Sequence, residues 1–246
     1  MTSKTSPVRR LKQNRRRRVE ALAAFEHARK VYEIALLDDL TATIVTAVPQ
    51  ATHLTFDPPV ADGQLLRGIW TVTRDGRERQ LINRQDLDLV ELNAAELDGV
   101  LYQAFDLFSV AWTATRPHDD TNPCVLDFPP ADRETRMSTL VREHYPEAQG
   151  LMLNLTSHSA HLIAVHGGDT PFTVIRQDSD GRPESALFPD STQRQIVNLA
   201  VQLAFVPGSS LYRTAPTHGR VFNRVRMALK PAPSTPPQKH QPEEEG

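Results

Sequence analysis

The stretch that decides the fold is Val48-Pro49-Gln50-Ala51-Thr52-His53-Leu54, because a similar stretch, Tyr145-Pro146-Glu147-Ala148-Gln149-Gly150-Leu151, follows 97 residues later. A helical pattern precedes each stretch and a strand pattern follows it. The residue before a proline is biased away from the helical conformation, so each preceding helix is expected to stop at its proline.

The similarity continues in the same order along both halves. Leu65-Leu66, Trp70-Thr71-Val72-Thr73-Arg74 and Asp75-Gly76-Arg77 correspond to Leu162-Ile163, Phe172-Thr173-Val174-Ile175-Arg176 and Asp180-Gly181-Arg182. This order favours an internal duplication, in which one module is used twice. The alternative is two unrelated antiparallel modules that share turn chemistry, because Asp-Gly turns recur in many hairpins.

The chain is predicted to be an α+β protein of two similar units, each an antiparallel sheet of three to four strands flanked by N- and C-terminal helices. Its 246 residues are enough for two ordinary domains. The expected segments are a basic disordered arm (1–14), a first α-β-β-β-α unit (15–116), a Pro-rich linker (117–130), a second α-β-α unit with a basic C-terminal segment (131–230) and a disordered tail (231–246).

The first unit is expected to begin with a long helix that runs from within residues 15–19 to about residue 48. Asp38-Asp39 near its middle leaves a break into two helices open. Further helices are expected behind Asn93, which opens a capping box with Glu96, over residues 132–144, and behind Asp190 or Ser191. The apolar residues of the long helix recur mostly at steps of three and four, which predicts one buried stripe of Leu22, Phe25, Tyr32, Leu36, Leu40, Ile44 and Ala47.

Strands are expected at residues 52–56, 65–74 and 77–83 in the first unit and at 150–155, 161–166, 172–177 and 184–188 in the second. Asp75-Gly76 predicts a two-residue type I′ turn, because both residues tolerate a positive φ. Residues 211–230 fit either structure, since Val221, Val225 and Leu229 have helical spacing while residues 225–229 also alternate.

The composition excludes several classes of protein. A single cysteine, Cys124, excludes an internal disulfide framework and a cysteine-only metal site. Prolines interrupt the longest uncharged runs, so no run reaches the roughly 20 apolar residues of a membrane span. Glu20 and Glu26 break up any secretory signal, with a mitochondrial presequence as the minor alternative. The excess of Arg over Lys is typical of a GC-rich genome and indicates a cytoplasmic, bacterial protein.

The net charge of −2 hides a strong asymmetry. Residues 1–30 hold ten Lys or Arg and two acids, whereas residues 31–120 hold fifteen acids and six Arg. The basic run could neutralise several phosphates, with salt-sensitive affinity as its signature. Alternatively, it pairs with the acidic first unit or with an acidic face of a partner. The candidate nucleic-acid-binding residues are Arg9, Arg10, Lys12, Arg15, Arg16, Arg17, Arg18, Arg220, Arg224 and Arg226.

Four arginines mark the two Asp-Gly turns. Arg74 and Arg77 are expected to face each other across the first turn, and Arg176 and Arg182 to flank the second. Like charges placed directly opposite each other destabilise a hairpin. These pairs are therefore either solvated tips or contacts for an anion or an acidic partner.

The residues that could carry catalysis or hold a metal are poorly placed for either. His161 and His166 lie near His158 and Asp169, but a separation of five along one strand predicts opposite faces, which argues against a shared metal. His118 precedes two aspartates in the predicted linker, without a nucleophile at motif spacing. Nucleophile-elbow, phosphate-loop and dinucleotide motifs are absent from the sequence. We therefore expect no metal and no cofactor, and assign no catalytic residue.

Three classes of function remain. The leading hypothesis is a non-enzymatic interaction or adaptor protein, whose duplicated units present surfaces to a protein partner. The alternative is a nucleic-acid-binding accessory protein that uses the basic arm and the basic C-terminal segment. The third is an enzyme whose site lies at the junction of the two units, where clefts often form.

Overall fold

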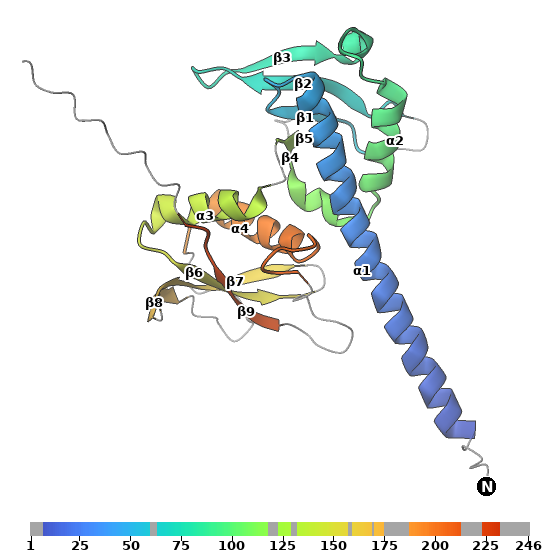
Figure 1. Ribbon diagram of the computed structural model, residues 1–246, viewed down its shortest axis with the longest axis vertical. Helices are drawn as coiled ribbons and strands as arrows, with labels where there is room; N and C mark the ends of the chain where they lie inside the picture. The colour runs from blue at the N-terminus through green and yellow to red at the C-terminus, as the bar shows by residue number, and fades with distance from the viewer. Residues whose placement is uncertain are drawn as a thin grey trace, which may run out of the picture.

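The computed structural model describes residues 7–59, 63–117, 123–128, 132–156, 159–168, 170–174, 187–212 and 223–231. Within these ranges the protein has an α+β fold with two antiparallel sheets (Figure 1). Each sheet has its own pair of α-helices, and one continuous hydrophobic core joins the two halves. None of the described helices is long and apolar enough to cross a membrane.

The first sheet has five strands in the order β3-β2-β1-β5-β4. The strands are β1 (His53–Phe56), β2 (Leu66–Val72), β3 (Glu78–Asn83), β4 (Thr115–Pro117) and β5 (Cys124–Asp127). The helices of this half are α1 (Pro7–Ala47) and α2 (Ala94–Ala104), with 3-10 turns η1 (Arg84–Val90) and η2 (Val110–Ala114). The fully buried ring of Phe56 lies 4.6 Å from that of Phe105, so β1 packs against the end of α2.

The second sheet has four strands in the order β8-β7-β6-β9. The strands are β6 (Gly150–Leu155), β7 (Ala160–Gly167), β8 (Thr170–Val174) and β9 (Asn223–Ala228). Helices α3 (Arg133–His144) and α4 (Asp190–Leu203) pack together over this sheet. The region left open between helix and strand, residues 211–230, thus contributes a strand at residues 223–228.

Both prolines end their helices as expected, since α1 stops at Ala47 and α3 at His144. The predicted correspondence of the two halves is wrong further along the chain. Trp70 lies in β2, the second strand of its sheet, whereas Phe172 lies in β8, the third strand. The turn between β7 and β8, at Gly167-Gly168, follows the second strand of its sheet, as the Asp75-Gly76 turn does in the first sheet. Asp180-Gly181 lies outside the described residues.

The expected segment boundaries also differ from the structure. Helix α1 starts at Pro7, inside the segment expected to be a disordered arm, because proline suits the first helical position. It continues unbroken through Asp38-Asp39. Within the segment expected to be a Pro-rich linker, Cys124–Asp127 form β5, which pairs with β1 and β4 inside the first sheet. The first sheet is therefore larger than the three to four strands expected.

The cap of α2 is as expected, because the Asn93 side chain accepts hydrogen bonds from the amides of Ala95 and Glu96. At α4 the N-cap residue is Pro189, which supplies no side-chain bond, instead of Asp190 or Ser191. Of the strand expected at 184–188, only Leu187 and Phe188 are described, and they are not in a strand.

A buried polar network joins the two halves. The Arg133 guanidinium on α3 is 1% exposed and donates to both oxygens of Asp38 on α1, at 2.7 and 3.1 Å. Its Nε donates to Gln202 Oε1 on α4 at 2.8 Å, and Gln202 Nε2 donates to the Thr113 carbonyl of η2 at 3.0 Å. Removing one partner of such a buried pair is costly. The network therefore fixes the relative placement of α1, α3, α4 and η2.

Candidate interaction surface

The N-terminal half of α1 extends beyond the rest of the molecule (Figure 1). Near the middle of α1, His27 contacts the body, with its ring 5.5 Å from that of Phe205 and 5.8 Å from that of Tyr212. Lys30 lies over the Phe205 ring at 5.2 Å. From residue 11 to residue 26, all side chains are exposed except the half-buried Val19 and Ala23. We call residues 7–26 the arm; at 1.5 Å per residue it is about 30 Å long.

Local sequence does not explain why the arm is helical. Its first turn has no acidic residue, and the cations near its N-terminus oppose the helix dipole. Arg16 and Glu20 form an exposed ion pair along the arm, at 2.7 Å. In proteins, most of the stability of a helix comes from tertiary packing of one of its faces rather than from the propensity of its residues. A contact that covers the arm would therefore stabilise it.

An exposed line of apolar side chains runs along α1. It consists of Leu11, Leu22, Phe25 and Tyr32, which are 55%, 54%, 65% and 53% exposed. The sequence pattern predicted that the last three of these would be buried, and this prediction is wrong. The buried face of α1 lies to one side of them and starts only at Lys30. The periodicity identifies apolar residues along one side of the helix. It cannot show that the rest of the protein covers only the C-terminal half of that helix.

The apolar line leads to a second exposed group, Tyr102, Leu107 and Phe108, which we call the apolar corner. Leu107 and Phe108 are 85% and 79% exposed in the turn after α2. Two contacts hold the end of α2 and this turn against α1: Tyr32 Oη donates to Gln103 Oε1 of α2 at 2.9 Å, and Arg29 lies 3.5 Å from Asp106 of the turn. The line and the corner thus meet where the arm leaves the body.

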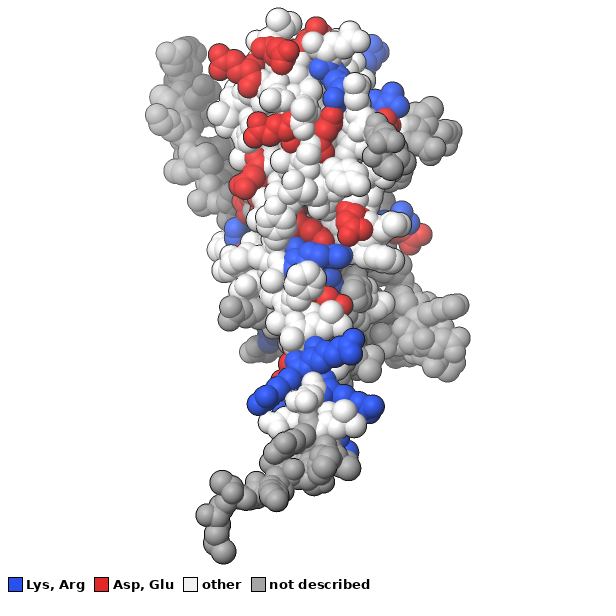
Figure 2. Space-filling model, turned by 90° about the vertical axis from the view of Figure 1, so that its right-hand side faces the viewer, with Lys and Arg blue, Asp and Glu red and all other residues white. Residues whose placement is uncertain are grey.

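The predicted basic residues of the N-terminus lie on the arm. Lys12 and Arg15–18 are exposed, and Arg9 and Arg10 belong to the same helix. Figure 2 shows cations gathered on the arm at the bottom of the molecule, with most acidic side chains of this face higher up. Of the C-terminal set, Arg224 and Arg226 are exposed on β9, a separate element, and Arg220 lies outside the described residues.

The arginines of the first turn are not paired as predicted. Thr73 is opposite Arg77, since its amide donates to the Arg77 carbonyl at 2.9 Å, and Arg74 belongs to a three-residue loop. Of that loop only Gly76 has a positive φ, 79°, so the turn is not type I′. Arg77 lies 3.3 Å from Asp75. A bond from Thr73 to Asp75 lowers the pKa of that carboxyl. Arg176 and Arg182 lie outside the described residues.

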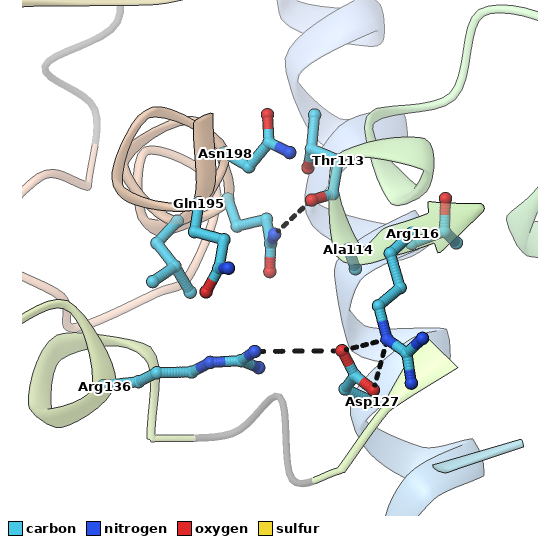
Figure 3. A pocket seen from close by; sticks show the side chains of 10 residues that line it. Thr113, Ala114, Arg116, Asp127, Arg136, Gln195 and Asn198 are labelled. Carbon is cyan, nitrogen blue, oxygen red and sulfur yellow. Dashed lines mark hydrogen bonds and ion pairs between the residues drawn. The ribbon is translucent and has the colours of Figure 1, made fainter. Parts of the chain in front are cut away.

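A small polar cavity lies at the junction of the two halves (Figure 3). Arg116 Nε donates to both oxygens of Asp127, at 3.1 and 3.2 Å, and Arg136 of α3 lies 3.8 Å from the same carboxylate. Gln195 and Asn198 of α4 form the opposite wall. The cavity measures about 100 Å³, well below the usual size of a small-molecule site. It gathers polar groups from both halves, but no nucleophile beside a base.

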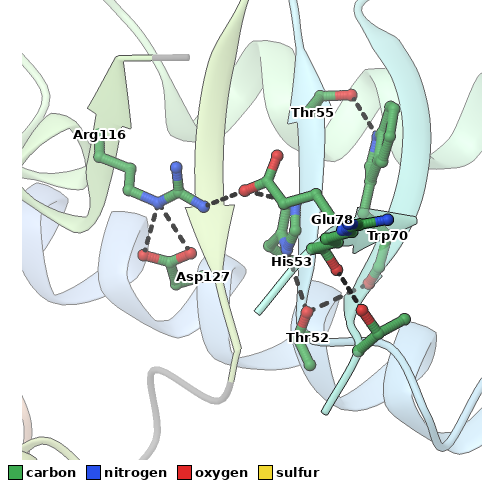
Figure 4. A network of polar contacts seen from close by, with 9 residues as sticks. Thr52, His53, Thr55, Trp70, Glu78, Arg116 and Asp127 are labelled. Carbon is green, nitrogen blue, oxygen red and sulfur yellow. Dashed lines mark hydrogen bonds and ion pairs between the residues drawn. The ribbon is translucent and has the colours of Figure 1, made fainter. Parts of the chain in front are cut away.

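Figure 4 shows a polar network on the outer face of the first sheet. Arg116 donates to Glu78 at 3.1 Å, and the buried His53 places Nε2 3.6 Å from the same carboxylate. Trp70 Nε1 donates to Thr55 Oγ1 at 2.9 Å beside them. Sequence reasoning missed this group because its members come from different strands. A His–carboxylate pair suits acid–base chemistry, but here Arg116 already engages the carboxylate.

The histidine prediction for the second sheet is corrected by a β-bulge. His161 is opposite Asn154 and His166 is opposite Gly150, and these two β6 residues are four apart and share a face. One extra residue in β7 therefore brings both histidines to the same side, about 13 Å apart. That distance still prevents joint ligation. The described residues contain no group of three or more His, Cys, Asp or Glu that could hold a metal ion.

Three further predicted residues, His118, His158 and Asp169, lie outside the described residues. Cys124 on β5 is half-buried, and burial together with the nearby Asp57 raises the pKa of its thiol, which disfavours the reactive thiolate.

Comparisons with protein-family models, with curated proteins and with solved structures found no match.

Proposed function

We propose that the two halves are copies of one module. The module consists of a helix, a three-stranded meander, a second helix and a strand that returns beside the first strand. Equivalent backbone bonds support this proposal. The amide of Ala51 donates to the Val48 carbonyl and that of Ala148 to the Tyr145 carbonyl, both at 2.9 Å. In each sheet the last strand returns antiparallel beside the first, as β5 beside β1 and β9 beside β6.

The pairing irregularities give further support for duplication. A bulge falls between Ile69 and Trp70 where β2 pairs with β3, and another between Val165 and His166 where β7 pairs with β8. Trp70 and His166 also accept equivalent bonds, because their carbonyls receive the amides of Thr52 and Gln149, each at 2.8 Å. Bulges are specific features of a strand pair, so their agreement favours one module over two unrelated ones.

We propose that this duplicated scaffold is a non-enzymatic interaction protein and that the arm is its contact element. The observation that carries the proposal is the exposed apolar line, which continues into the apolar corner. Several exposed large apolar side chains on one side of a molecule are typical of protein-binding sites. An amphipathic helix that lays its apolar face on a partner is a recurrent mode of recognition.

A photo-crosslinking amino acid tests which side of the arm meets a partner. We expect p-benzoylphenylalanine at position 25 to form a covalent adduct with another protein chain in cells that make the full-length protein. The matched control is position 24, which is also exposed but points to another side of the helix. Absence of an adduct at position 25, or equal adducts at both positions, would contradict the proposal.

Nucleic-acid binding is the second candidate function, and one observation favours it. Arg15–18 are consecutive, so at 100° per residue they present cations on every side of an exposed helix. Replacing all four by Gln should then reduce affinity for duplex DNA and flatten its dependence on salt by up to about four units of slope. Binding that ignores salt, or no binding at low salt, would exclude this candidate.

A further inference from the structure

Whatever covers the arm must meet two requirements together. It must bring apolar surface for Leu22 and Phe25, and acidic groups for Arg15–18. We propose that this partner is a second copy of the chain, which binds antiparallel along the same face of α1. This inference rests on the proposed interaction function, and it names the partner.

The spacing along the exposed face supports a helix as the occupant. Steps of four and three residues alternate without interruption from residue 11 to residue 36, through Leu11, Arg15, Arg18, Leu22, Phe25, Arg29, Tyr32 and Leu36. Apolar residues at this alternation form the contact face of coiled coils, and here five of the eight positions are apolar or aromatic while the other three are arginines. A partner of other shape would not need such regular spacing.

The distribution of charge supports an antiparallel second copy. Residues 1–30 are strongly basic and residues 31–120 strongly acidic, so an antiparallel pair, which brings the arm of one copy to the body of the other, is less repulsive than a parallel pair. A parallel pair would place Arg15–18 beside the same arginines, which is repulsive. With the two-fold axis between Leu22 and Phe25, each Leu22 meets Phe25 of the other copy.

The same register gives two of the exposed arginines a partner. Arg15 comes level with Tyr32 of the other copy, whose half-exposed ring can accept a cation. Arg18 comes level with Arg29, which is a like charge, but Glu33 already pairs with that guanidinium at 2.9 Å and Asp106 lies 3.5 Å from it. The Asp106 side chain is 54% exposed and lies 3.5 Å from Arg29, so its carboxylate has room for a second guanidinium.

The C-terminal segment of the same chain is a weaker occupant. Residues 232–246 contain Glu243, Glu244 and Glu245, which could meet the arm's charge, but no Leu, Ile, Val, Met or aromatic residue to cover the apolar line. If this segment covered the arm, deleting residues 232–246 would expose the arm.

Sedimentation equilibrium of the full-length chain tests the proposal. We expect a mass of twice 27.5 kDa that falls on dilution. Phe25→Glu should weaken association by about a hundredfold or more, since it places a charge at the two-fold axis. Ala24→Glu is the control with the same charge change on another side of the helix, and it should leave the dimer intact.

Charge exchange tests the register. Arg18→Glu and Asp106→Arg should each weaken the dimer, and the double variant should recover most of the loss. A chain that is monomeric at every concentration, a Phe25→Glu dimer as strong as the wild type, or an effect that depends on residues 232–246 would overturn the proposal. A monomer that still crosslinks another protein through position 25 leaves the proposed function standing. A monomeric chain that forms no crosslink through position 25 contradicts both the proposed dimer and the proposed interaction function.

Discussion

Helices α1 and α3 occupy the same position in their halves, directly before a proline and the first strand of a sheet, yet α1 has 41 residues and α3 has 12. The short helix shows what length of helix is enough to pack on a sheet in this scaffold. In α3, the residues Met137 and Val141 are fully buried, and the helix ends where the packing ends. The additional turns of α1 that form the arm are therefore not required by the fold, and their exposed apolar line calls for another explanation.

The largest expected difference lies between two leucines of α1. Leu37 is fully buried, so Leu37→Ala should lower the free energy of unfolding by about 2–5 kcal/mol. Leu22→Ala on the arm should change it by less than about 0.5 kcal/mol. Both are measured by urea denaturation in the Phe25→Glu background, so that self-association does not contribute. A large loss for Leu22→Ala would mean that the arm packs on its own body.

Breaking the ion pair between Asp38 on α1 and Arg133 on α3 should have the next largest effect on stability. Asp38→Asn leaves the buried guanidinium of Arg133 without its counter-charge, which we expect to cost about 3 kcal/mol of unfolding free energy. Adding Arg133→Met should recover part of this loss, because the uncompensated charge is then gone. Glu20→Gln, which breaks the exposed Arg16 pair on the arm, is the control and should have no measurable effect. Equal effects at the two sites would contradict this difference.

A smaller effect, the dependence of stability on pH, should distinguish the second sheet from the first. Burial, assisted by Arg226, lowers the pKa of His166, whereas Trp70, at the corresponding place in the proposed repeat, is not ionisable. Below the ordinary histidine pKa of about 6.5, the unfolded chain takes up a proton that the folded protein does not, so stability falls as the pH falls. The slope should reach at most about 1.4 kcal/mol per pH unit. His166→Gln should flatten the profile between pH values of about 7 and 5; an unchanged profile would show that His166 is not responsible.

Local signals in the sequence predicted much of the secondary structure. Pro49 and Pro146 end their helices, Asn93 caps α2, and the strand at residues 150–155 has the predicted bounds. Each of these features depends on residues that are close together in the chain. The α+β class with two antiparallel sheets is therefore confirmed.

The errors concern long-range pairing. β5 lies among prolines that indicate a linker, and its place in the sheet depends on pairing with β1, some seventy residues earlier. The bulge in β7 adds a single residue that no sequence period reveals, and it changes the faces on which the histidines lie. The network of His53, Glu78 and Arg116 is formed by three strands, so no motif could have indicated it.

The sequence predicted some features of the candidate interaction surface but not its exposure. The basic residues and the apolar stripe of the first helix were both evident from the sequence. What the sequence could not show is where the body ends, and hence that Phe25 and Leu22 are exposed while Leu40 and Ile44 are buried. That boundary is set by His27 against Phe205, a contact between residues far apart in the chain.

Hydrogen exchange along α1 tests the central claim most directly, namely that a partner covers the apolar face of the arm. At concentrations where the wild type self-associates, we predict slowed amide exchange at residues 11–26 and rapid exchange there in Phe25→Glu. Residues 34–47 should be equally protected in both proteins, because they pack on the body. Rapid exchange of the arm in the wild type, or the same protection of the arm in both proteins, would contradict the account.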